Sequence, residues 1–245
     1  MEKSIQLILL MFGLMVSSFC AAQTKIYYLD RYGTIQDEAE YTALKESALK
    51  STGMHNGDSL VLFENIIELS NRNDTILYSY TWIVTDNIRE LENEYQQLNA
   101  MIGEVFPIIS SKTLQDSTIT IDNLKGKPTL INLWFTRCAP CIREMPILNE
   151  IQSENSERFN FLAITMDSEP KVNRFLEKHP FQFDHIVNSK ELTTQLGFRH
   201  FPMNIFLDKE GRIILIENSV PLRVNENGIS EMCSEKFLRV LESLL

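Results

Sequence analysis

The sequence predicts a three-layer α/β sandwich with a central mixed sheet, preceded by a small α+β domain. From residue 102 onward, apolar strand-like runs alternate with helical patterns, which is typical of a sheet covered by helices on both faces. The last two runs flank the turn Asp208-Lys-Glu-Gly211, which predicts an antiparallel hairpin in an otherwise parallel arrangement. With 245 residues, the chain has room for one large or two small domains.

The first folded part is predicted over residues 23–85. Residues 25–29 are expected to form a strand and residues 37–50 a helix. Two apolar runs, 60–69 and 75–85, are separated by turn-forming residues and predict a hairpin. The second run alternates apolar and mostly polar side chains, as a half-buried strand requires. We interpret its apolar face as core, with partner binding as the alternative; the face consists of Ile76, Tyr78, Tyr80, Trp82 and Val84.

Residues 86–100 are predicted to form a connecting helix, because apolar side chains recur there at helical spacing. The second domain then covers residues 101–245. Its expected strands are 119–121, 129–135, 159–166, 184–187, 204–207 and 212–216, with residues 122–128 as a turn. Its expected helices are 141–154, with a kink at Pro146, then 170–178, and 190–196 closed by Gly197.

Residues 1–22 have the layout of a secretory signal peptide. Lys3 precedes a short apolar run over residues 5–19, and small residues follow at the expected cleavage site. The sequence therefore predicts export to the periplasm or cell envelope. A lipoprotein signal with a lipid anchor at Cys20 is the alternative, although Phe19 is bulky where such signals have a small residue.

The formal net charge of −10 and the lack of a basic segment argue against nucleic-acid binding.

The pair Cys138-Ala-Pro-Cys141 lies between a predicted strand and a predicted helix. The first cysteine is then close to unpaired N–H groups and to the positive end of the helix dipole, which stabilise a thiolate. The second can close a reversible disulfide, so the pattern favours thiol–disulfide exchange. Half of a zinc site and a structural disulfide are the alternatives. Cys20 and Cys233 are isolated. Cys233 lies within residues 231–237, which are expected inside a C-terminal helix; we interpret it as a small semi-buried side chain, with a third redox thiol as the alternative.

Several motifs in a fixed order resemble the TlpA/ResA-like branch of the thioredoxin superfamily over about residues 101–245. They include Leu124-Lys-Gly-Lys-Pro128, Asn132-Leu-Trp-Phe135, the cysteine pair, Glu144-Met-Pro146, Met166-Asp167 and the segment 197–203. The resemblance implies a thioredoxin-like thiol–disulfide oxidoreductase with no cofactor beyond the redox-active Cys138–Cys141 disulfide. It also implies protein or peptide disulfides as substrates and a membrane thiol electron donor that re-reduces the pair.

The resemblance assigns expected roles to single residues. Cys138 matches the nucleophile and Cys141 the resolving cysteine, while Pro202 matches a cis-proline that packs against the pair. Trp134 occupies a position where the family packs an aromatic behind the active site, and Pro140 lies inside the pair, where it helps to set the reduction potential.

The sequence departs from the family pattern at positions around the pair. Arg137 replaces a frequent tryptophan and places a cation beside Cys138, and Phe201 is bulkier than the usual residue before the cis-proline. Asn132 replaces the buried acid of thioredoxins proper. Glu144 is then a candidate for handling the proton of Cys141, and a favourable charge at the helix N-terminus is its alternative role.

Two functions from other classes remain as alternatives. A copper-handling chaperone on the same fold would need a histidine near the pair, and His200 is the candidate, although the usual C-x-x-x-C spacing is absent. A partner-binding protein would instead use the N-terminal part for recognition and the second domain as a scaffold. No metal site is predicted.

Overall fold

The computed structural model describes residues 24–52, 60–108, 110–198, 200–224, 226, 228 and 230–245. The predicted signal peptide and the predicted lipid anchor at Cys20 lie outside the described residues, as does Arg199. In the part of the chain that is described, no helix combines the length and the apolar character needed to cross a bilayer.

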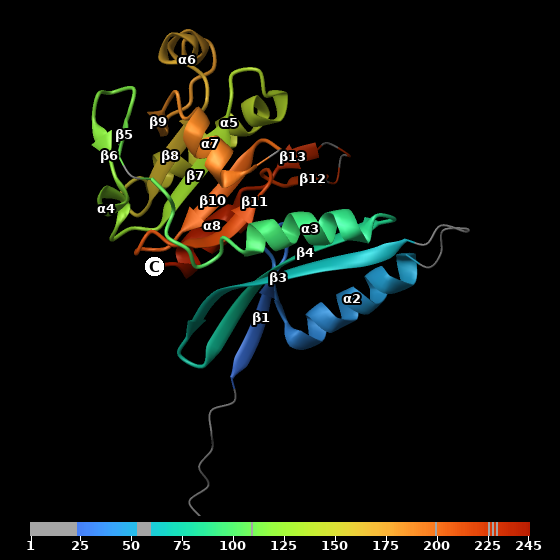
Figure 1. Cartoon of the computed structure of the whole chain (residues 1–245). Coiled ribbons are helices and arrows are strands. Elements are labelled where there is room, and N and C mark those ends of the chain that lie inside the picture. The colour runs from blue at the N-terminus through green and yellow to red at the C-terminus, as the bar shows by residue number, and fades with distance from the viewer. Residues whose placement is uncertain are drawn as a thin grey trace, which may run out of the picture.

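The N-terminal part forms a four-stranded sheet with the order β2-β1-β4-β3 (Figure 1). Its strands are β1 (Lys25–Leu29), β2 (Ile35–Asp37), β3 (Val61–Arg72) and β4 (Thr75–Thr85), and its helices are α2 (Glu38–Thr52) and α3 (Ile88–Asn99). β3 and β4 form the predicted hairpin, whose turn residues Asn73 and Asp74 both have positive φ angles. Asparagine and aspartate tolerate this conformation, which matches the twist of the two strands.

The aromatic face of β4 packs against α2. Tyr41 of α2 stacks on Tyr28 with ring centroids 3.8 Å apart and meets Tyr80 edge-on at 4.9 Å. Tyr80 is buried, which agrees with the interpretation of this face as core, whereas Val84 near the strand end is 50% exposed. The core therefore covers the middle of the predicted face and not its end.

A five-stranded sheet with the order β11-β10-β7-β8-β9 forms the centre of the second part. β7 (Thr129–Trp134) pairs in parallel with β8 (Asn160–Thr165) and antiparallel with β10 (Met203–Leu207). The outer strands are β9 (Asp184–Ile186), parallel to β8, and β11 (Ile213–Glu217), antiparallel to β10. The helices around this sheet are α5 (Ala139–Asn155), α6 (Glu169–Leu176), α7 (Lys190–Leu196) and α8 (Glu235–Ser243).

Two apolar clusters lie on the two faces of this sheet and confirm the three-layer prediction. Leu130 and Trp134 of β7 belong to a cluster that includes Leu148 of α5, while Ile131 and Leu133 belong to the opposite one. The assignment alternates along β7 because successive strand side chains point to opposite faces. Every residue of β7 is buried, as expected for a central strand covered on both sides.

The N-terminal sheet shares one of these clusters. Leu29 and Leu69 from the sheet pack into the same core as Leu241 of α8. Gly33, at φ 87°, lies so close to the start of α8 that an added Cβ would be 2.6 Å from the Cβ of Glu235. The two parts therefore pack against each other through buried apolar contacts.

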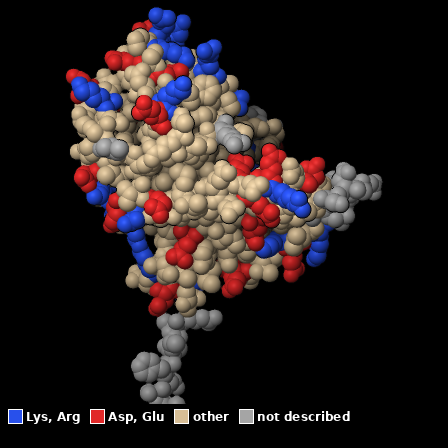
Figure 2. Space-filling model, viewed as in Figure 1, with Lys and Arg blue, Asp and Glu red and all other residues tan. Residues whose placement is uncertain are grey.

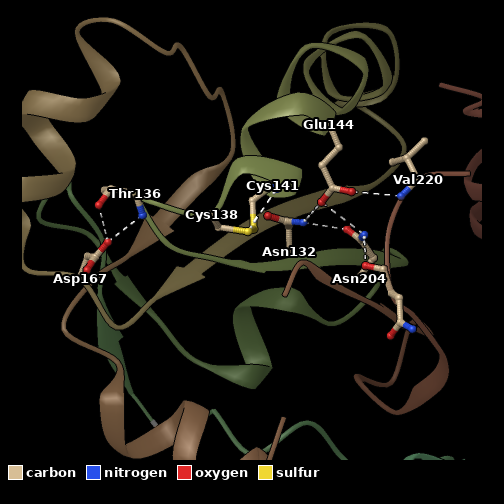
Figure 3. The surroundings of a disulfide bond; sticks show 9 residues. Asn132, Thr136, Cys138, Cys141, Glu144, Asp167, Asn204 and Val220 are labelled. Carbon is tan, nitrogen blue, oxygen red and sulfur yellow. Dashed lines mark hydrogen bonds between the residues drawn. A yellow bond between two sulfur atoms is a disulfide. The ribbon is translucent and has the colours of Figure 1, made fainter. Parts of the chain in front are cut away.

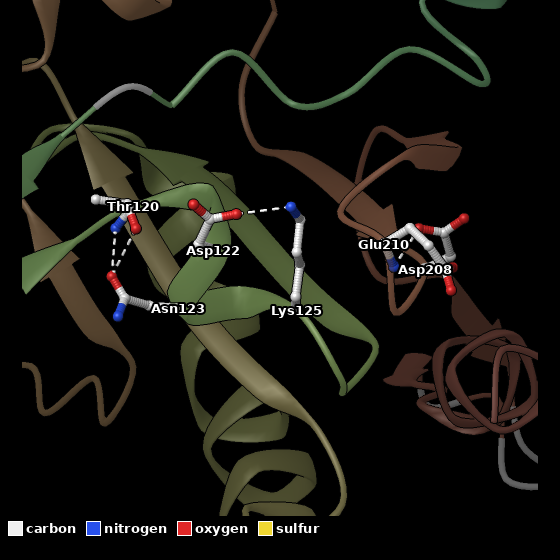
Figure 4. Close-up of polar contacts among 6 residues, drawn as sticks. All are labelled: Thr120, Asp122, Asn123, Lys125, Asp208 and Glu210. Atoms are coloured by element: carbon white, nitrogen blue, oxygen red, sulfur yellow. Dashed lines mark hydrogen bonds and ion pairs between the residues drawn. The ribbon is translucent and has the colours of Figure 1, made fainter.

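Some predicted elements are displaced by local hydrogen bonding. The strand expected at 119–121 is limited to β6 (Thr118–Ile119), which pairs with β5 (Ser111–Lys112), and the expected turn contains helix α4 (Ile121–Leu124). Figure 4 shows the cause: Asn123 Oδ1 accepts hydrogen bonds from the N–H and the hydroxyl of Thr120, both 2.8 Å. This contact caps the helix at the point where the strand was expected to continue.

The predicted C-terminal helix begins later than expected. β13 (Ser230–Met232) pairs with β12 (Leu222–Val224), and α8 starts only at Glu235. Cys233 therefore lies between a strand and a helix and is buried, with 5% of its surface exposed. Helix α5 begins earlier than expected, at Ala139 instead of residue 141, and continues through Pro146 to Asn155.

Candidate active site

The two cysteines of the pair form a disulfide at the N-terminus of α5, directly after the central strand β7 (Figure 3). Cys138 is the N-cap residue, and its Sγ accepts a hydrogen bond from the N–H of Cys141 at 3.2 Å. Cys138 keeps 4% of its surface exposed, while Cys141 has none. A thiolate at Cys138 would therefore be stabilised by an N–H group and by the helix dipole, and Cys138 is the sulfur that an incoming substrate can meet.

The turn that leads from β7 to Cys138 is held by Asp167, the second residue after β8. Asp167 Oδ2 accepts hydrogen bonds from the N–H and the hydroxyl of Thr136, at 2.7 and 2.8 Å, and its other oxygen pairs with Lys171 at 2.5 Å. Burial alone would raise the pKa of Asp167, but the hydrogen bonds from Lys171 and Thr136 outweigh it and lower the pKa. An ionised carboxylate thus anchors the loop ahead of the nucleophile.

Glu144 is fully buried one helical turn after Cys141. Its Oε1 accepts a hydrogen bond from Asn132 Nδ2 at 2.7 Å and a longer one from Asn204 Nδ2 at 3.5 Å, and its Oε2 accepts the N–H of Val220 at 3.0 Å. Burial raises the pKa of Glu144 to about 7, and the three donors limit that rise. Its carboxyl group therefore changes protonation near neutral pH.

Asn132 of β7 lies between Glu144 and the cysteine pair, as Figure 3 shows. Its Nδ2 donates to Glu144 and also to Asn204 Oδ1 at 2.9 Å. Its Oδ1 is buried and has no hydrogen-bond partner, and Figure 3 shows it on the side of the disulfide. A buried acceptor without a partner is unusual, and it is placed to receive a hydrogen bond from a thiol of the reduced pair.

The peptide bond between Phe201 and Pro202 is cis, as the resemblance implied. The Phe201 ring meets the Phe135 ring edge-on with centroids 5.5 Å apart, and the carbonyl oxygen of Phe135 accepts the N–H of Cys138 at 3.0 Å. This chain of contacts places the segment around Pro202 beside the loop that carries the nucleophile. The Phe201 ring therefore contacts the loop that leads to Cys138.

Of the other predicted site residues, Trp134 is buried behind the cysteine loop, while Arg137 and Pro140 are exposed in it. Trp134 is fully buried among Phe175, Phe181 and His185, with ring centroids 5.2 to 5.9 Å away, so it supports the site from behind. Arg137 and Pro140 are exposed on either side of Cys138. Solvent therefore screens the effect of the Arg137 charge on the thiolate.

Two groups considered from the sequence as redox or metal candidates have other surroundings. Burial, followed by the Glu235 carboxylate, raises the pKa of the Cys233 thiol to about 11, which disfavours its reactive thiolate form. His200 is exposed and lines a cleft with α3. Among the described residues, no three His, Cys, Asp or Glu side chains are grouped so that they could hold a metal ion.

Sequence reasoning found the cysteine pair, the cis-proline and Glu144, but it gave no role to Asp167, Asn204 or Val220. Asp167 had one usable signal, because an acid directly after a strand parallel to β7 lies at the same sheet edge as the cysteine loop. The N–H of Val220 carries no side-chain signal, so its contact with Glu144 could not be found without the fold.

Comparison with known proteins identifies a family and several similar proteins. The Redoxin family pattern matches residues 101–230, which is more than half of the chain, so residues 24–100 lie outside the match. The chain is 29% identical over 115 residues to the Thioredoxin-like protein YneN of Bacillus subtilis, covering 45% of this chain and 68% of that protein. It is 26% identical over 146 residues to the thiol-disulfide oxidoreductase ResA of Halalkalibacterium halodurans, covering 58% and 78%.

A similar solved structure is that of a putative thiol:disulfide interchange protein DsbE from Chlorobium tepidum. It has a TM-score of 0.48 and 17% identity, and the match covers 59% of this chain and 98% of that one.

Proposed function

The chain belongs to the Redoxin family and is a thiol–disulfide oxidoreductase with a thioredoxin-like fold, and we propose that it is an exported reductant of protein disulfides. One observation carries the proposal: Cys138 caps α5 with its sulfur at a backbone N–H group, and the resolving sulfur of Cys141 is buried directly behind it. This arrangement provides one attacking thiolate at Cys138 and one buried thiol at Cys141 that can reach the sulfur of Cys138 once a substrate is attached to it.

The proposed reaction is a pair of thiol–disulfide exchanges. The Cys138 thiolate attacks one sulfur of a substrate disulfide, whose S–S bond breaks and releases a thiolate that takes up a proton. Cys141 then loses its proton and attacks Cys138, which releases the second substrate thiol and leaves the Cys138–Cys141 disulfide. Two electrons pass from the enzyme pair to the substrate, and a membrane thiol electron donor restores the dithiol.

We propose Glu144 as the group that accepts the proton of Cys141 during the second exchange. Its pKa of about 7 suits a group that both takes up and releases a proton at neutral pH. Asn132 lies between the two groups and holds the Glu144 carboxylate, so we propose it as a positioning residue that receives the Cys141 S–H hydrogen bond in the dithiol form.

Export rests on the sequence of residues 1–22, with Cys20 as the point of a lipid anchor if the leader is of the lipoprotein type. In an oxidising periplasm or cell envelope, a pair kept reduced requires an electron supply, which is why a membrane donor belongs to the proposal. No cofactor beyond the Cys138–Cys141 pair is proposed. The substrates are protein or peptide disulfides, and nucleic acid is not among the partners.

The activity is tested by reduction of insulin disulfides with the wild-type protein, with Cys138→Ser and with Cys141→Ser. We expect activity only in the wild type, and equal activity in the wild type and Cys138→Ser would refute the assignment. The direction is tested by the reduction potential of the pair in a dithiothreitol titration. A value near about −270 mV supports a reductant, and a value near about −120 mV would instead indicate an oxidant.

A further inference from the structure

Helix α3 and the segment that leads into Pro202 enclose a cleft of about 390 Å³. One wall is a face of α3, with Glu90, Glu94 and Gln97, and the other includes Phe198 and His200. The floor is apolar and is formed by Leu98, Met101, Leu196 and Met203. The volume suits a few side chains of a bound ligand.

The cleft adjoins the reactive centre. His200 and Met203, which line it, flank Phe201 and Pro202 in the sequence, and the Phe201 ring contacts Phe135 in the loop before Cys138. A chain that reaches Cys138 across the Pro202 segment can therefore continue into the cleft. We propose that this cleft binds the segment of a client polypeptide that adjoins its disulfide, and that it selects clients with lysine or arginine there.

The charge of the α3 wall supports this choice of client. Within the described lining of the cleft, Glu90 and Glu94 are carboxylates and neither lysine nor arginine occurs. Figure 2 shows several acidic side chains around α3 on the face viewed, with a basic side chain among them. Charge complementarity across an interface contributes mainly to specificity and to the rate of association.

The spacing of the two carboxylates also matches an extended chain. Glu90 and Glu94 are one helical turn apart on α3, a separation of about 6 Å along the helix axis. Alternate side chains of an extended strand point to the same side and are separated by about 6.6 Å. Basic residues at alternate positions of the client can thus face both carboxylates at once, while their aliphatic stems cover the apolar floor.

The inference extends the proposed function, so its experiment measures the two separately. The reduced Cys141→Ser variant is reacted with peptides whose single cysteine forms a disulfide with 4-thiopyridine. The Cys138 thiolate attacks the peptide sulfur, the bond to the thiopyridine sulfur breaks, and the released 4-thiopyridone is followed by absorbance. Two peptides are compared that differ only in having lysine or glutamate at alternate positions around the cysteine. The neutral reagent 4,4′-dithiodipyridine measures the chemistry of Cys138 without a peptide.

We expect the lysine peptide to react faster than the glutamate peptide, and Glu90→Gln with Glu94→Gln to reduce this preference. Each exposed ion pair is worth a factor of about two to five, so the double variant should lower the rate ratio by about fourfold to twenty-five-fold. Glutamine keeps an acceptor for the Asn87 side chain, which donates to Glu90 at 2.7 Å and caps α3. The matched control is Glu92→Gln with Glu68→Gln, which removes two exposed carboxylates that are not part of the cleft lining.

A loss of preference that is equal in the double variant and its control would overturn the inference, because it would reflect net charge alone. Equal rates for the two peptides in the unsubstituted background would overturn it as well. In both cases a normal rate with 4,4′-dithiodipyridine leaves the proposed function intact. Failure of Cys138 to react with that reagent would instead count against the proposed function itself.

Discussion

Replacement of Glu144 by glutamine should change the pH dependence of stability in a defined direction. The carboxyl group is fully buried, and burial raises its pKa from 4.5 to about 7 in the folded protein. Between these two pH values the folded protein keeps a proton that the unfolded chain releases. The folded state binds more protons there, so the free energy of unfolding must fall as the pH rises.

The size of this fall follows from the shift. Each pKa unit corresponds to about 1.4 kcal/mol, so the burial of Glu144 costs up to about 3 kcal/mol once the carboxyl is ionised. Glu144→Gln lacks this titration. It adds a loss of about 1–3 kcal/mol at every pH, because one glutamine oxygen replaces two carboxylate oxygens as acceptors for Asn132 and Val220.

The variant should therefore be less stable than the wild type at pH 5, and it should recover about 3 kcal/mol relative to the wild type by pH 8. The assay is urea unfolding of the oxidised proteins across this range, with the m-value checked for each. Other titrating groups occur in both proteins and cancel in the difference. Glu150→Gln, at an exposed position of the same helix, is the matched control. A stability difference that stays constant from pH 5 to pH 8, or that moves in the opposite direction, would refute the burial argument.

Three further substitutions test contacts of α8 and of the loop before Cys138. Gly33→Ala should destabilise the protein by about 1–3 kcal/mol more than Gly103→Ala in urea unfolding, because both have a positive φ but only at Gly33 would the new Cβ overlap α8. Equal losses would contradict the close contact of the two parts. Lys236→Ala should lower the free energy of unfolding by about 3 kcal/mol in the same assay, because it leaves the Glu217 carboxylate of a buried ion pair without its partner. An unchanged free energy of unfolding would contradict the pairing. Asp167→Ala should destabilise the protein by about 1–3 kcal/mol and speed hydrogen exchange of the Thr136 amide, and unchanged exchange would show that the loop is held otherwise.

The centre of the fold could be predicted because its three inner strands, β7, β8 and β10, are apolar and almost entirely buried. Residues 129–135 contain a continuous apolar run, and β7 is buried at every position. The helix over 190–196 was predicted to end at Gly197, and this glycine does adopt the left-handed conformation after α7. β2, β5, β12 and β13 were not predicted, and β6 shares only Ile119 with the strand expected at 119–121, because each has only two or three residues and exists through its pairing partner.

The candidate site could be predicted only where its chemistry lies within one segment. The cysteine pair combines strand end, helix start and thiol spacing within a few residues, so its sequence is sufficient. Glu144 allowed two interpretations, as a proton acceptor or as a favourable charge at a helix terminus. In the structure its carboxyl group is buried and accepts hydrogen bonds from β7, from β10 and from the N–H of Val220, which lies 76 positions away. Such a network depends on tertiary contacts, and a single sequence carries no local signal for it.

Helix α3 shows how a correct secondary-structure prediction can miss a role. The spacing of Ile88, Leu91, Tyr95 and Leu98 predicted a connecting helix, and α3 lies where it was expected, yet none of its residues is fully buried. Its apolar stripe is only half covered, because one part packs on the N-terminal sheet and Leu98 faces the cleft beside the Pro202 segment. Leu29 and Leu69 anchor that sheet in the same core as α8, so the helix is held at a fixed place relative to Cys138. A recognition surface next to a reactive thiol requires this kind of support, which a helix on a flexible linker could not provide.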